Sequence, residues 1–311
     1  MIKTAILTGV TSSGKTSIAL DFAKKNKKIE IINADSLLIY KTLDIGTAKP
    51  SAQDLKSVKH HMVDIRNPDE TFTAGDFVRE TQKALNDIHA RNKRALIVGG
   101  TGFYLKALLF GLWEAPQTNT DLRKKLDELD SMTLFKELEN FDPESAYRIT
   151  PNDRYRLIRA LETITLSGKT PSQLESEAQK REVRSDLFLM ITDREDDDLL
   201  KRIQTRTQQM IVDGIIEETK SLMTHYPESR TLLSVGYRET SDFIKGIAPQ
   251  GRKMRPGING LTDEINLGTK QLVKRQRTWF QGQFINRNVG KIYTLEQDYD
   301  QLVLDLESIY L

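Results

Sequence analysis

Short runs of apolar, often β-branched residues recur along the chain and alternate with stretches of helical periodicity. The apolar runs are predicted strands at Ala5–Thr8, Glu30–Asn33, Met62–Ile65, Ala95–Val98, Leu187–Thr192 and Lys291–Leu295. Predicted helices separate several of them, as at Ser17–Lys25 and Asp76–Arg91. Strands that are apolar throughout and alternate with helices are typical of a parallel sheet covered on both faces. The pattern therefore predicts an α/β fold.

The strand pattern stops between about Pro116 and Glu182, where only helical periodicity is found. Helices are predicted there at Asp121–Leu138, Asn152–Ser167 and Pro171–Lys180. A helical block between strands indicates an insertion, so we predict an α/β core of residues 1–112 and 186–311 and a helical domain of residues 113–185. Further helices are expected at Asp196–His225 and Leu267–Gln283, and a Gly/Pro-rich loop at Lys245–Gly260.

The first predicted strand is followed at once by a glycine-rich segment that matches G-x-x-x-x-G-K-[ST]. It consists of Gly9, Val10, Thr11, Ser12, Ser13, Gly14, Lys15 and Thr16. In such a loop the backbone N–H groups face phosphate oxygens, the lysine adds a positive charge and the final hydroxyl can bind Mg²⁺. A plain Gly/Ser turn is the alternative. The strand before the loop and the helix after it favour a phosphate site.

Ligands of parallel α/β sheets bind at the carboxyl ends of the strands. This rule groups the phosphate loop with Asp35, just beyond Glu30–Asn33, and with Gly99-Gly100-Thr101, just beyond Ala95–Val98. We expect these three distant segments to line one crevice.

The charge is nearly balanced, with 46 basic and 44 acidic residues giving a net charge of +2. A basic zone lies between Gly251 and Lys291, where only Asp263 and Glu264 are acidic; it contains Arg252, Lys253, Arg255, Lys270, Lys274, Arg275, Arg277, Arg287 and Lys291. Such a zone is typical of proteins that bind a polyanion. The alternative is a solvated helix face.

The composition excludes several kinds of site. With no cysteine, the chain has no disulfide, thiolate nucleophile or cysteine-bound metal. The adjacent His60 and His61 would point apart on a strand, so a zinc site there is not expected. No secretory leader or bilayer-spanning run is found, so a cytoplasmic location away from membranes is expected.

Six further segments resemble the signatures of tRNA dimethylallyltransferases, also called tRNA isopentenyltransferases. They are Asn33–Tyr40 with Leu43–Pro50, His60–Ile65 with Phe72–Phe77, Gly99–Leu105, Ile149–Asp153 with Arg156–Glu162, Val235–Glu239 and Lys274–Phe280. The match follows the family order over nearly the whole chain. Three positions depart from the usual pattern. Val10 stands where the family usually has proline, Leu38 where many relatives have glutamine, and Gln281 where a basic residue is common.

The resemblance implies a P-loop NTPase-like sheet with an inserted helical domain that binds tRNA. It also implies the transfer of a dimethylallyl group from dimethylallyl diphosphate to the exocyclic amine of adenosine 37, beside the anticodon, with release of pyrophosphate. The implied partners are Mg²⁺ and the tRNA anticodon stem-loop, and a monomer is the default state.

The family pattern gives catalytic roles to Lys15, Asp35, Thr101 and Arg206. Arg206, four residues after Arg202 on one predicted helix face, is expected to bind the leaving pyrophosphate with Lys15 and Thr16. Asp35 is the expected base or orienter of the amine, with an outer Mg²⁺ ligand as the alternative. Thr101 is expected to contact the diphosphate or the adenine, and helix capping is its alternative.

The expected tRNA contacts lie in three groups along the chain. They comprise Asp35, Ser36, Leu37 and Leu38; Arg123, Arg156 and Arg159 in the insertion; and Gly236, Tyr237, Arg238, Lys274, Arg275, Gln276, Arg277 and Trp279. Phe280, within the last group, is expected in the core instead. Basic and aromatic side chains together can serve phosphates and stacked bases.

Three other functions fit a phosphate loop. An adenylate isopentenyltransferase would prenylate free AMP or ATP, but the helical insertion and Lys274–Phe280 argue against so small a substrate. A P-loop nucleotide kinase would transfer a phosphoryl group. A non-catalytic RNA-binding NTPase is the last alternative.

Overall fold

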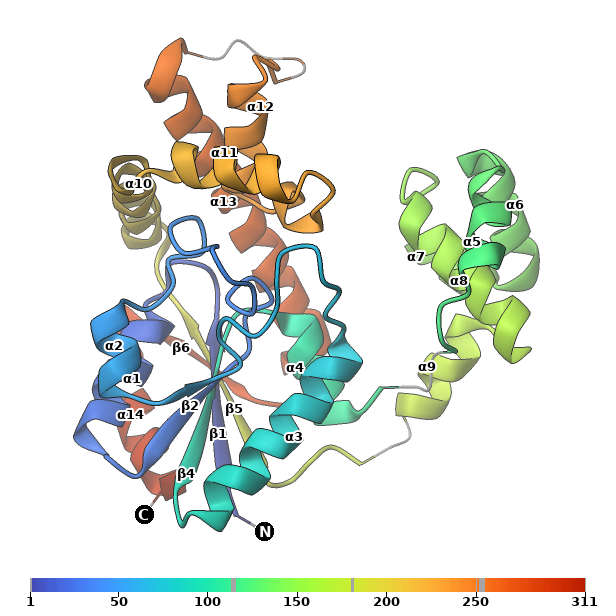
Figure 1. Cartoon of the computed structure of the whole chain (residues 1–311). Coiled ribbons are helices and arrows are strands. Elements are labelled where there is room, and N and C mark those ends of the chain that lie inside the picture. Colours follow the sequence, from blue (N-terminus) through green and yellow to red (C-terminus); the bar gives the residue numbers. More distant parts are fainter. Residues whose placement is uncertain (1, 113–115, 180–181, 250, 252–254, 311) are drawn as a thin grey trace. The chain divides into compact units, whose positions relative to one another are not determined.

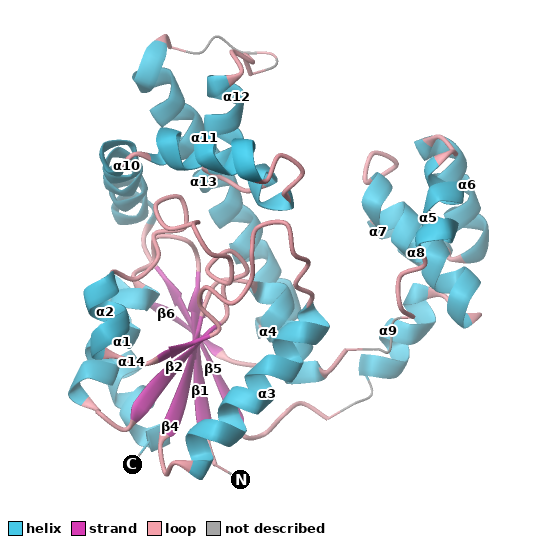
Figure 2. Ribbon diagram, viewed as in Figure 1, coloured by secondary structure: helices cyan, strands magenta, loops and turns pink. Residues whose placement is uncertain are grey.

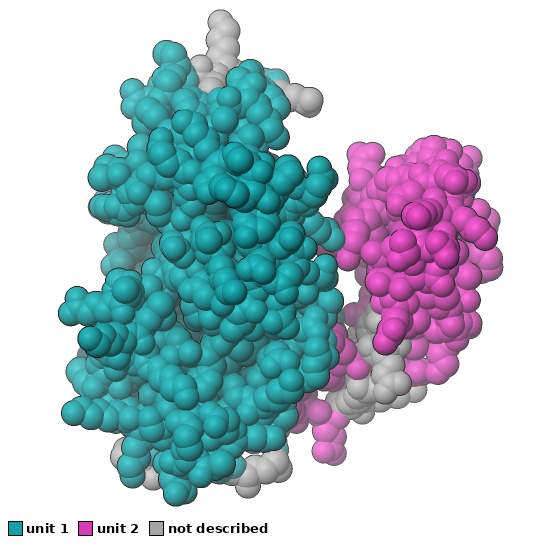
Figure 3. Space-filling model, in the orientation of Figure 1, with its two compact units in different colours: residues 1–106, 185–311 teal, residues 107–184 magenta. Residues whose placement is uncertain are grey.

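The computed structural model describes residues 2–112, 116–179, 182–249, 251 and 255–310. These divide into two compact units, residues 1–106 with 185–311 and residues 107–184 (Figure 3). The second unit begins six residues before the position expected from the sequence, since α4 (Gly102–Phe110) already crosses the boundary. Arg252 and Lys253 of the basic zone lie outside the described residues, and no described helix is long and apolar enough to cross a membrane.

The first unit is built on a six-stranded sheet in the order β3-β2-β4-β1-β5-β6 (Figure 2). Its strands are β1 (Thr4–Gly9), β2 (Ile29–Asn33), β3 (His60–His61), β4 (Arg94–Val98), β5 (Leu187–Asp193) and β6 (Lys291–Thr294). All neighbouring strands run parallel. Residues of β1 and β2 are buried throughout, which confirms the parallel α/β sheet predicted from continuous apolar runs.

Helices cover both faces of this sheet (Figure 1). They are α1 (Lys15–Lys25), α2 (Ala52–Ser57), α3 (Ala74–Ala90), the start of α4 and α14 (Leu295–Tyr310). Ile18 and Phe22 of α1 pack with Leu302 and Leu306 of α14 in one core cluster over Leu7 of the sheet. The helix α3 begins with a capping box in which Thr73 and Asp76 satisfy each other's backbone N–H groups.

A second group of helices gathers beyond the carboxyl ends of the strands (Figure 1). It consists of α10 (Asp196–Asp213), α11 (Ile215–His225), α12 (Tyr237–Ile244) and α13 (Gly257–Gln283), with the short 3-10 turns η1 (Arg230–Leu233) and η2 (Ile285–Arg287). This group places long helices over the strand ends, where the ligand is expected.

The second unit contains only helices among its described residues. These are the end of α4, α5 (Thr120–Asp127), α6 (Ser131–Phe141), α7 (Pro143–Arg148), α8 (Arg154–Ser167) and α9 (Pro171–Gln179). They enclose their own core, in which Leu134 and Leu138 of α6 pack with Leu157 and Leu161 of α8.

Four sequence expectations were wrong in detail. Met62–Ile65 is no strand, because Met62 and Asp64 adopt positive φ angles of 64° and 56°. The expected helix Asp121–Leu138 is divided because Asp130 caps a new helix through the N–H groups of Met132 and Thr133. Gly214, with φ 99°, likewise divides Asp196–His225. The helix α13 begins at Gly257, inside the expected loop.

Candidate active site

The segment between β1 and α1 is the loop for which the sequence predicts phosphate binding. Gly14 has φ 98°, a conformation that L side chains rarely adopt, and it turns the chain into α1. The first turn of a helix has N–H groups without intrahelical acceptors, so the loop offers donors to an anion. Ser13 uses its own donors within the protein, because its N–H binds Val10 O at 3.2 Å and its hydroxyl meets Thr192 Oγ1 at 2.8 Å. Ser13 thus shapes the loop.

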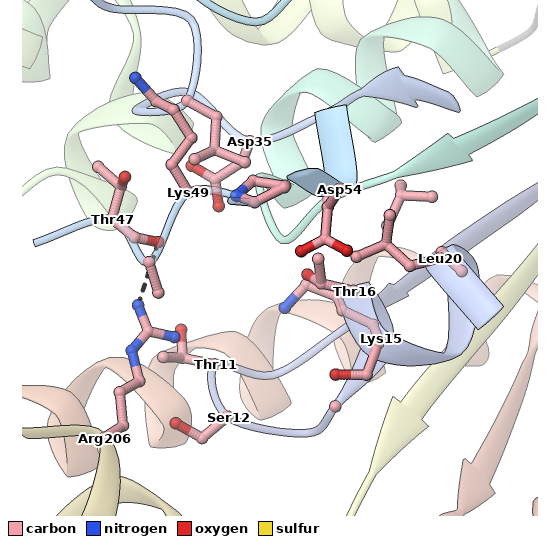
Figure 4. A pocket seen from close by; sticks show the side chains of 18 of the residues that line it. Thr11, Ser12, Lys15, Thr16, Leu20, Asp35, Thr47, Lys49, Asp54 and Arg206 are labelled. Atoms are coloured by element: carbon pink, nitrogen blue, oxygen red, sulfur yellow. Dashed lines mark hydrogen bonds between the residues drawn. The ribbon is translucent and has the colours of Figure 1, made fainter. Parts of the chain in front are cut away.

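A cavity of about 680 Å³ opens beside this loop, and every residue that lines it belongs to the first unit (Figure 4). The residues used below are Ser12, Lys15, Thr16, Asp35, Thr47, Lys49, Arg202 and Arg206. The expected convergence of the phosphate loop, Asp35 and the segment Gly99-Gly100-Thr101 is confirmed for Gly99, whereas Gly100 and Thr101 do not line the cavity. The Ser12 hydroxyl has no hydrogen-bond partner among the described residues, although it is buried.

Lys15 and Arg206, two partly buried cations on the cavity wall, have no carboxylate partner among the described residues. Lys15 donates only to Val10 O at 3.2 Å, and Arg206 donates only to Thr47 O at 3.3 Å (Figure 4). Burial lowers the pKa of Lys15 to about 8, with Asp35 opposing and Arg206 reinforcing the shift. Burial also lowers the pKa of Arg206 against the pull of Asp35. Unpaired cations beside a phosphate loop favour a multiply charged anion.

Arg202 lies one turn before Arg206 on α10, and both line the cavity, as their spacing predicts. Arg202 is exposed and its Nε bonds Asp198 Oδ2 at 2.6 Å. The two arginines therefore differ. The charge of Arg202 is already balanced by Asp198, whereas the charge of Arg206 is available to a ligand in the cavity.

Asp35 follows β2 and holds a tight turn. Its Oδ1 accepts the N–H of Leu37 at 2.9 Å, while its own N–H donates to Asn33 Oδ1 at 2.9 Å. The Thr101 hydroxyl accepts the N–H of Ser36 at 2.9 Å and donates to Ser36 Oγ at 3.2 Å. Thr101 therefore orients the Asp35 turn in this structure and does not face the cavity. Asp35 keeps its second carboxylate oxygen for the cavity.

The segment 43–50 contributes residues 47–50 to the cavity wall. Glu218 of α11 accepts the N–H groups of Asp44, Ile45 and Gly46 at 2.9, 2.8 and 3.0 Å, and the Tyr237 hydroxyl at 2.5 Å. Lys49, whose side chain is 5% exposed, reaches Tyr40 O, Asp44 and Asp64. These contacts fix the segment that presents the Thr47 carbonyl to Arg206.

The expected tRNA residues of α13 fall into two sets. Lys274 and Arg275 are exposed, and their side chains form no hydrogen bond or ion pair with the other described residues. Gln276, Trp279 and Arg277 point into the protein instead: Gln276 contacts Thr11, Trp279 packs on Gly102, and Arg277 pairs with Asp193 at 2.9 Å. Phe280, expected in the core, is 2% exposed, which confirms that prediction.

The expected contacts of α12 and of the Asp35 turn also differ in accessibility. Tyr237 is fully buried and its hydroxyl is committed to Glu218, so its side chain offers nothing to RNA here. Arg238 is half exposed and pairs with Glu239. Gly236 begins α12 with φ 96°. Ser36, Leu37 and Leu38 are partly exposed beside Asp35.

In the second unit, Arg123 and Arg159 converge on the fully buried Glu162. The ion-pair distances are 3.0 Å from Arg123 and 2.6 Å from Arg159. Burial alone would raise the pKa of Glu162, but hydrogen bonds from both arginines outweigh it and hold that pKa below its ordinary value. Arg156 is exposed and pairs with Asp153 at 3.0 Å. Arg123 and Arg159 therefore hold the core of the second unit through Glu162, and their contact with RNA stays a prediction.

Two residues that shape the site, Arg194 and Glu218, were not predicted from the sequence. Arg194, just past β5, donates from Nε to Ser13 O at 2.7 Å and pairs with Asp198 and Glu296. It fixes the phosphate loop from behind. Position after a strand end is the one signal that could have singled it out, and the same rule had found Asp35. For Glu218 no local signal exists.

The two histidines of β3 have separate surroundings. His61 Nε2 lies 2.7 Å from the carboxylate of the buried Glu30, which also binds Arg91 and Lys93. Burial would raise the pKa of Glu30, but these hydrogen bonds hold it well below the ordinary range. His60 lines the cavity, and its pKa is lowered by burial.

Comparisons with known proteins point to one family. A family model described as IPP transferase matches residues 38–283. A tRNA dimethylallyltransferase 1 from Citrifermentans bemidjiense is 41% identical over 281 residues, covering 90% of this chain and 89% of that protein. A tRNA dimethylallyltransferase from Geobacter sulfurreducens is 34% identical over 284 residues, with 89% and 88% of the two chains covered.

Solved structures give the same picture for the fold. The full-length tRNA isopentenylpyrophosphate transferase from Bacillus halodurans is 28% identical with a TM-score of 0.69, covering 100% of this chain and 96% of that one. A eukaryotic dimethylallyltransferase that acts on tRNA has a TM-score of 0.82 at 22% identity, over 100% and 79% of the chains, and shares the fold.

Proposed function

The chain belongs to the IPP transferase family, and on that premise we propose that it transfers a dimethylallyl group from dimethylallyl diphosphate to adenosine 37 of tRNA. The acceptor is the exocyclic amine, and pyrophosphate is released. The observation that carries the proposal is the cavity in which the phosphate loop, two unpaired cations and Asp35 meet. A diphosphate satisfies the cations, and Asp35 is left for the acceptor.

In the proposed reaction, the bond between the allylic carbon and the diphosphate oxygen breaks, and a bond from that carbon to the amine nitrogen forms. Negative charge accumulates on the leaving pyrophosphate. Lys15, Arg206 and the amides of the first turn of α1 are fixed where that charge develops, so they stabilise the transition state more than the ground state. No phosphoryl group is transferred.

The adenine amine is a weak nucleophile because its lone pair is delocalised into the ring. Asp35 is the proposed base: its free carboxylate oxygen accepts a hydrogen bond from the amine and takes up the proton that the nitrogen loses. The turn held by Asn33 and Thr101 aims this carboxylate. Thr101 thereby acts through the turn of Asp35.

Mg²⁺ fits the oxygen donors of the site. The Thr16 hydroxyl lines the cavity, and Mg²⁺ in such sites commonly binds one or two protein oxygens, the phosphates of the substrate and water. The described residues contain no cluster of three or more His, Asp or Glu side chains that could hold a metal by themselves. When bound, the ion would neutralise charge on the diphosphate.

The proposed RNA partner is the anticodon stem-loop, and the proposed setting is a cytoplasmic monomer. A base inside a structured loop must be turned out to reach Asp35, and filling the cavity with it would exclude water from the reacting carbon. Lys274 and Arg275 on α13 and Arg156 on α8 are exposed cations suited to the RNA backbone.

The test incubates the purified protein with Mg²⁺, dimethylallyl diphosphate and one acceptor: unmodified tRNA, AMP or ATP. The products are identified by mass spectrometry. We expect one added prenyl group in a tRNA that carries adenosines at positions 36 to 38, located at adenosine 37 by nuclease mapping. Prenylated AMP or ATP alone would indicate the adenylate enzyme instead. Phosphate transfer without prenylation would indicate a kinase.

A further inference from the structure

The carboxamide of Gln276 joins the two loops that form the floor of the site. Its Oε1 accepts the N–H of Thr11 in the phosphate loop at 2.8 Å, and its Nε2 donates to Gly100 O at 3.3 Å. Thr11 and Gly100 follow β1 and β4, which are adjacent strands of the sheet. One side chain from α13 therefore ties together both strand ends.

This contact restrains the phosphate loop where it leaves the sheet. A Cβ placed on Gly100 would lie 3.2 Å from Gln276 Nε2 and 3.5 Å from Lys15 Nζ, so the ends of both side chains lie close to Gly100. Because Gln276 occupies the Thr11 N–H, that donor is not available to a phosphate. The side chain instead holds the loop in the shape in which Lys15 meets the cavity.

The same helix also carries the exposed basic pair Lys274 and Arg275. One turn beyond Gln276, Trp279 packs on Gly102, where an added Cβ would lie 2.4 Å from the indole. Lys274 and Arg275 are exposed. The helix α13 thus contacts the catalytic loops through Gln276 and Trp279 and also carries the exposed cations Lys274 and Arg275.

We infer that Gln276 is a positioning residue for the diphosphate site, acting through the phosphate loop, and that α13 transmits RNA contact to that site. The inference rests on the proposed function for the identity of the ligands. It replaces the expectation that Gln276 contacts tRNA directly. RNA bound to the exposed cations and diphosphate bound to the loop that Gln276 holds favour the same placement of one helix, so each ligand raises the affinity for the other.

The first test measures pyrophosphate binding by calorimetry, without RNA, for the wild type, Gln276→Met and Gln276→Glu. Met keeps the length and removes both hydrogen bonds; Glu keeps the acceptor for Thr11 and adds a negative charge. We expect the dissociation constant to rise about tenfold for Met, because the phosphate loop is no longer held in place, and further for Glu. The control is Gln271→Met, an exposed position on the same helix.

A tRNA-binding measurement on the same variants separates the two roles. The positioning role predicts an unchanged tRNA dissociation constant for Gln276→Met in the absence of diphosphate. Weakened tRNA binding with unchanged pyrophosphate binding would overturn the inference and restore a direct RNA contact. Circular dichroism melting shows whether the Met variant folds. If it does not, pyrophosphate binding and tRNA binding are compared in the Glu variant instead.

The second test needs no change near the loop. Pyrophosphate affinity of the wild type is measured with and without a saturating anticodon stem-loop. We expect at least fivefold tighter binding with RNA, and no such gain in Gln276→Met. Equal affinities in the wild type would overturn the transmission through α13. Both tests read binding, so an absence of prenyl transfer would contradict the proposed function and leave the role of Gln276 to be judged separately.

Discussion

Single residues of the site differ mainly in whether a partner already satisfies their charge. Arg202 and Arg277 are paired with carboxylates, whereas Lys15 and Arg206 contact only carbonyl oxygens. A buried unpaired cation is costly, and a bound anion removes that cost. This contrast gives the residues separate, measurable roles.

Asp35→Asn should lower kcat by about a hundredfold or more, because the carboxamide keeps the turn but cannot accept the proton. Arg206→Ala should instead mainly raise KM for dimethylallyl diphosphate. Steady-state kinetics with a tRNA dissociation constant for each variant provides the check. Near-normal turnover of Asp35→Asn would show that the base is a different group.

The pH dependence should report Lys15. Its pKa of about 8 in the free protein means that its positive charge is present below pH 8 and is lost as the pH rises through that value. From pH 7 to pH 9 the charged fraction falls about tenfold, so kcat/KM for dimethylallyl diphosphate should fall about tenfold at saturating tRNA. A flat profile to pH 9.5 would show that Lys15 stays charged without ligand.

At the level of elements, helices beyond the sheet hold the loops of the site. Glu218 on α11 binds three consecutive N–H groups of the 43–50 segment, and Gln276 on α13 binds the phosphate loop. Loops anchored in this way keep the geometry that catalysis requires. The two helices therefore serve the site although neither is expected to contact the diphosphate.

Tyr237→Phe should test the Glu218 anchor. It removes one hydrogen bond to a carboxylate and should lower the free energy of unfolding by about 1–3 kcal/mol, as measured by urea denaturation. Glu218→Ala leaves four donors without their acceptor and should cost more. Both variants should raise KM for dimethylallyl diphosphate, since the Thr47 carbonyl beside Arg206 loses its support. An unchanged KM would restrict the anchor to stability.

Removing the charges of Lys274 and Arg275 by substitution with Gln should weaken tRNA binding. It should also reduce the slope of log K against log salt by about 1.5, the value for two cations that contact phosphates. Substituting Lys27 and Lys28, exposed near the end of α1, is the matched control. Filter binding at several salt concentrations gives both slopes. Equal slopes in the two variants would place α13 outside the RNA interface.

At the level of the whole molecule, the two units carry separate parts of the proposed activity. All residues that line the cavity belong to the first unit, whereas the buried Glu162 cluster stabilises the second. Each unit has its own hydrophobic core. A defect in one core should therefore leave the other unit's ligand site unchanged.

Glu162→Ala provides that test. It leaves Arg123 and Arg159 without their shared partner, and the second unit should lose about 2–3 kcal/mol, below the value for fully buried pairs because both arginines are partly exposed. Pyrophosphate affinity should stay unchanged while tRNA affinity falls. Thermal denaturation and the two binding assays provide the readout. A matching loss of pyrophosphate affinity would contradict the independence of the units.

The sequence by itself determined the parallel sheet, the phosphate loop and the place of Asp35 beyond β2. These features are local: apolar periodicity, glycine conformation and the end of a strand can all be read within about ten residues. It also predicted the Phe280 core position from the helix pattern. It failed at Met62–Ile65, because positive φ angles at Met62 and Asp64 leave no trace in an apolar run.

Only the tertiary structure decided which charged and polar side chains face a ligand. Gln276 meets Thr11, 265 residues away, and Arg123 meets Glu162, 39 residues away, whereas Arg206 meets no carboxylate among the described residues. An arginine or glutamine has the same local pattern in each of these settings. Partners brought together by the strand order and helix packing determine its role, because charge and hydrogen bonding act through space.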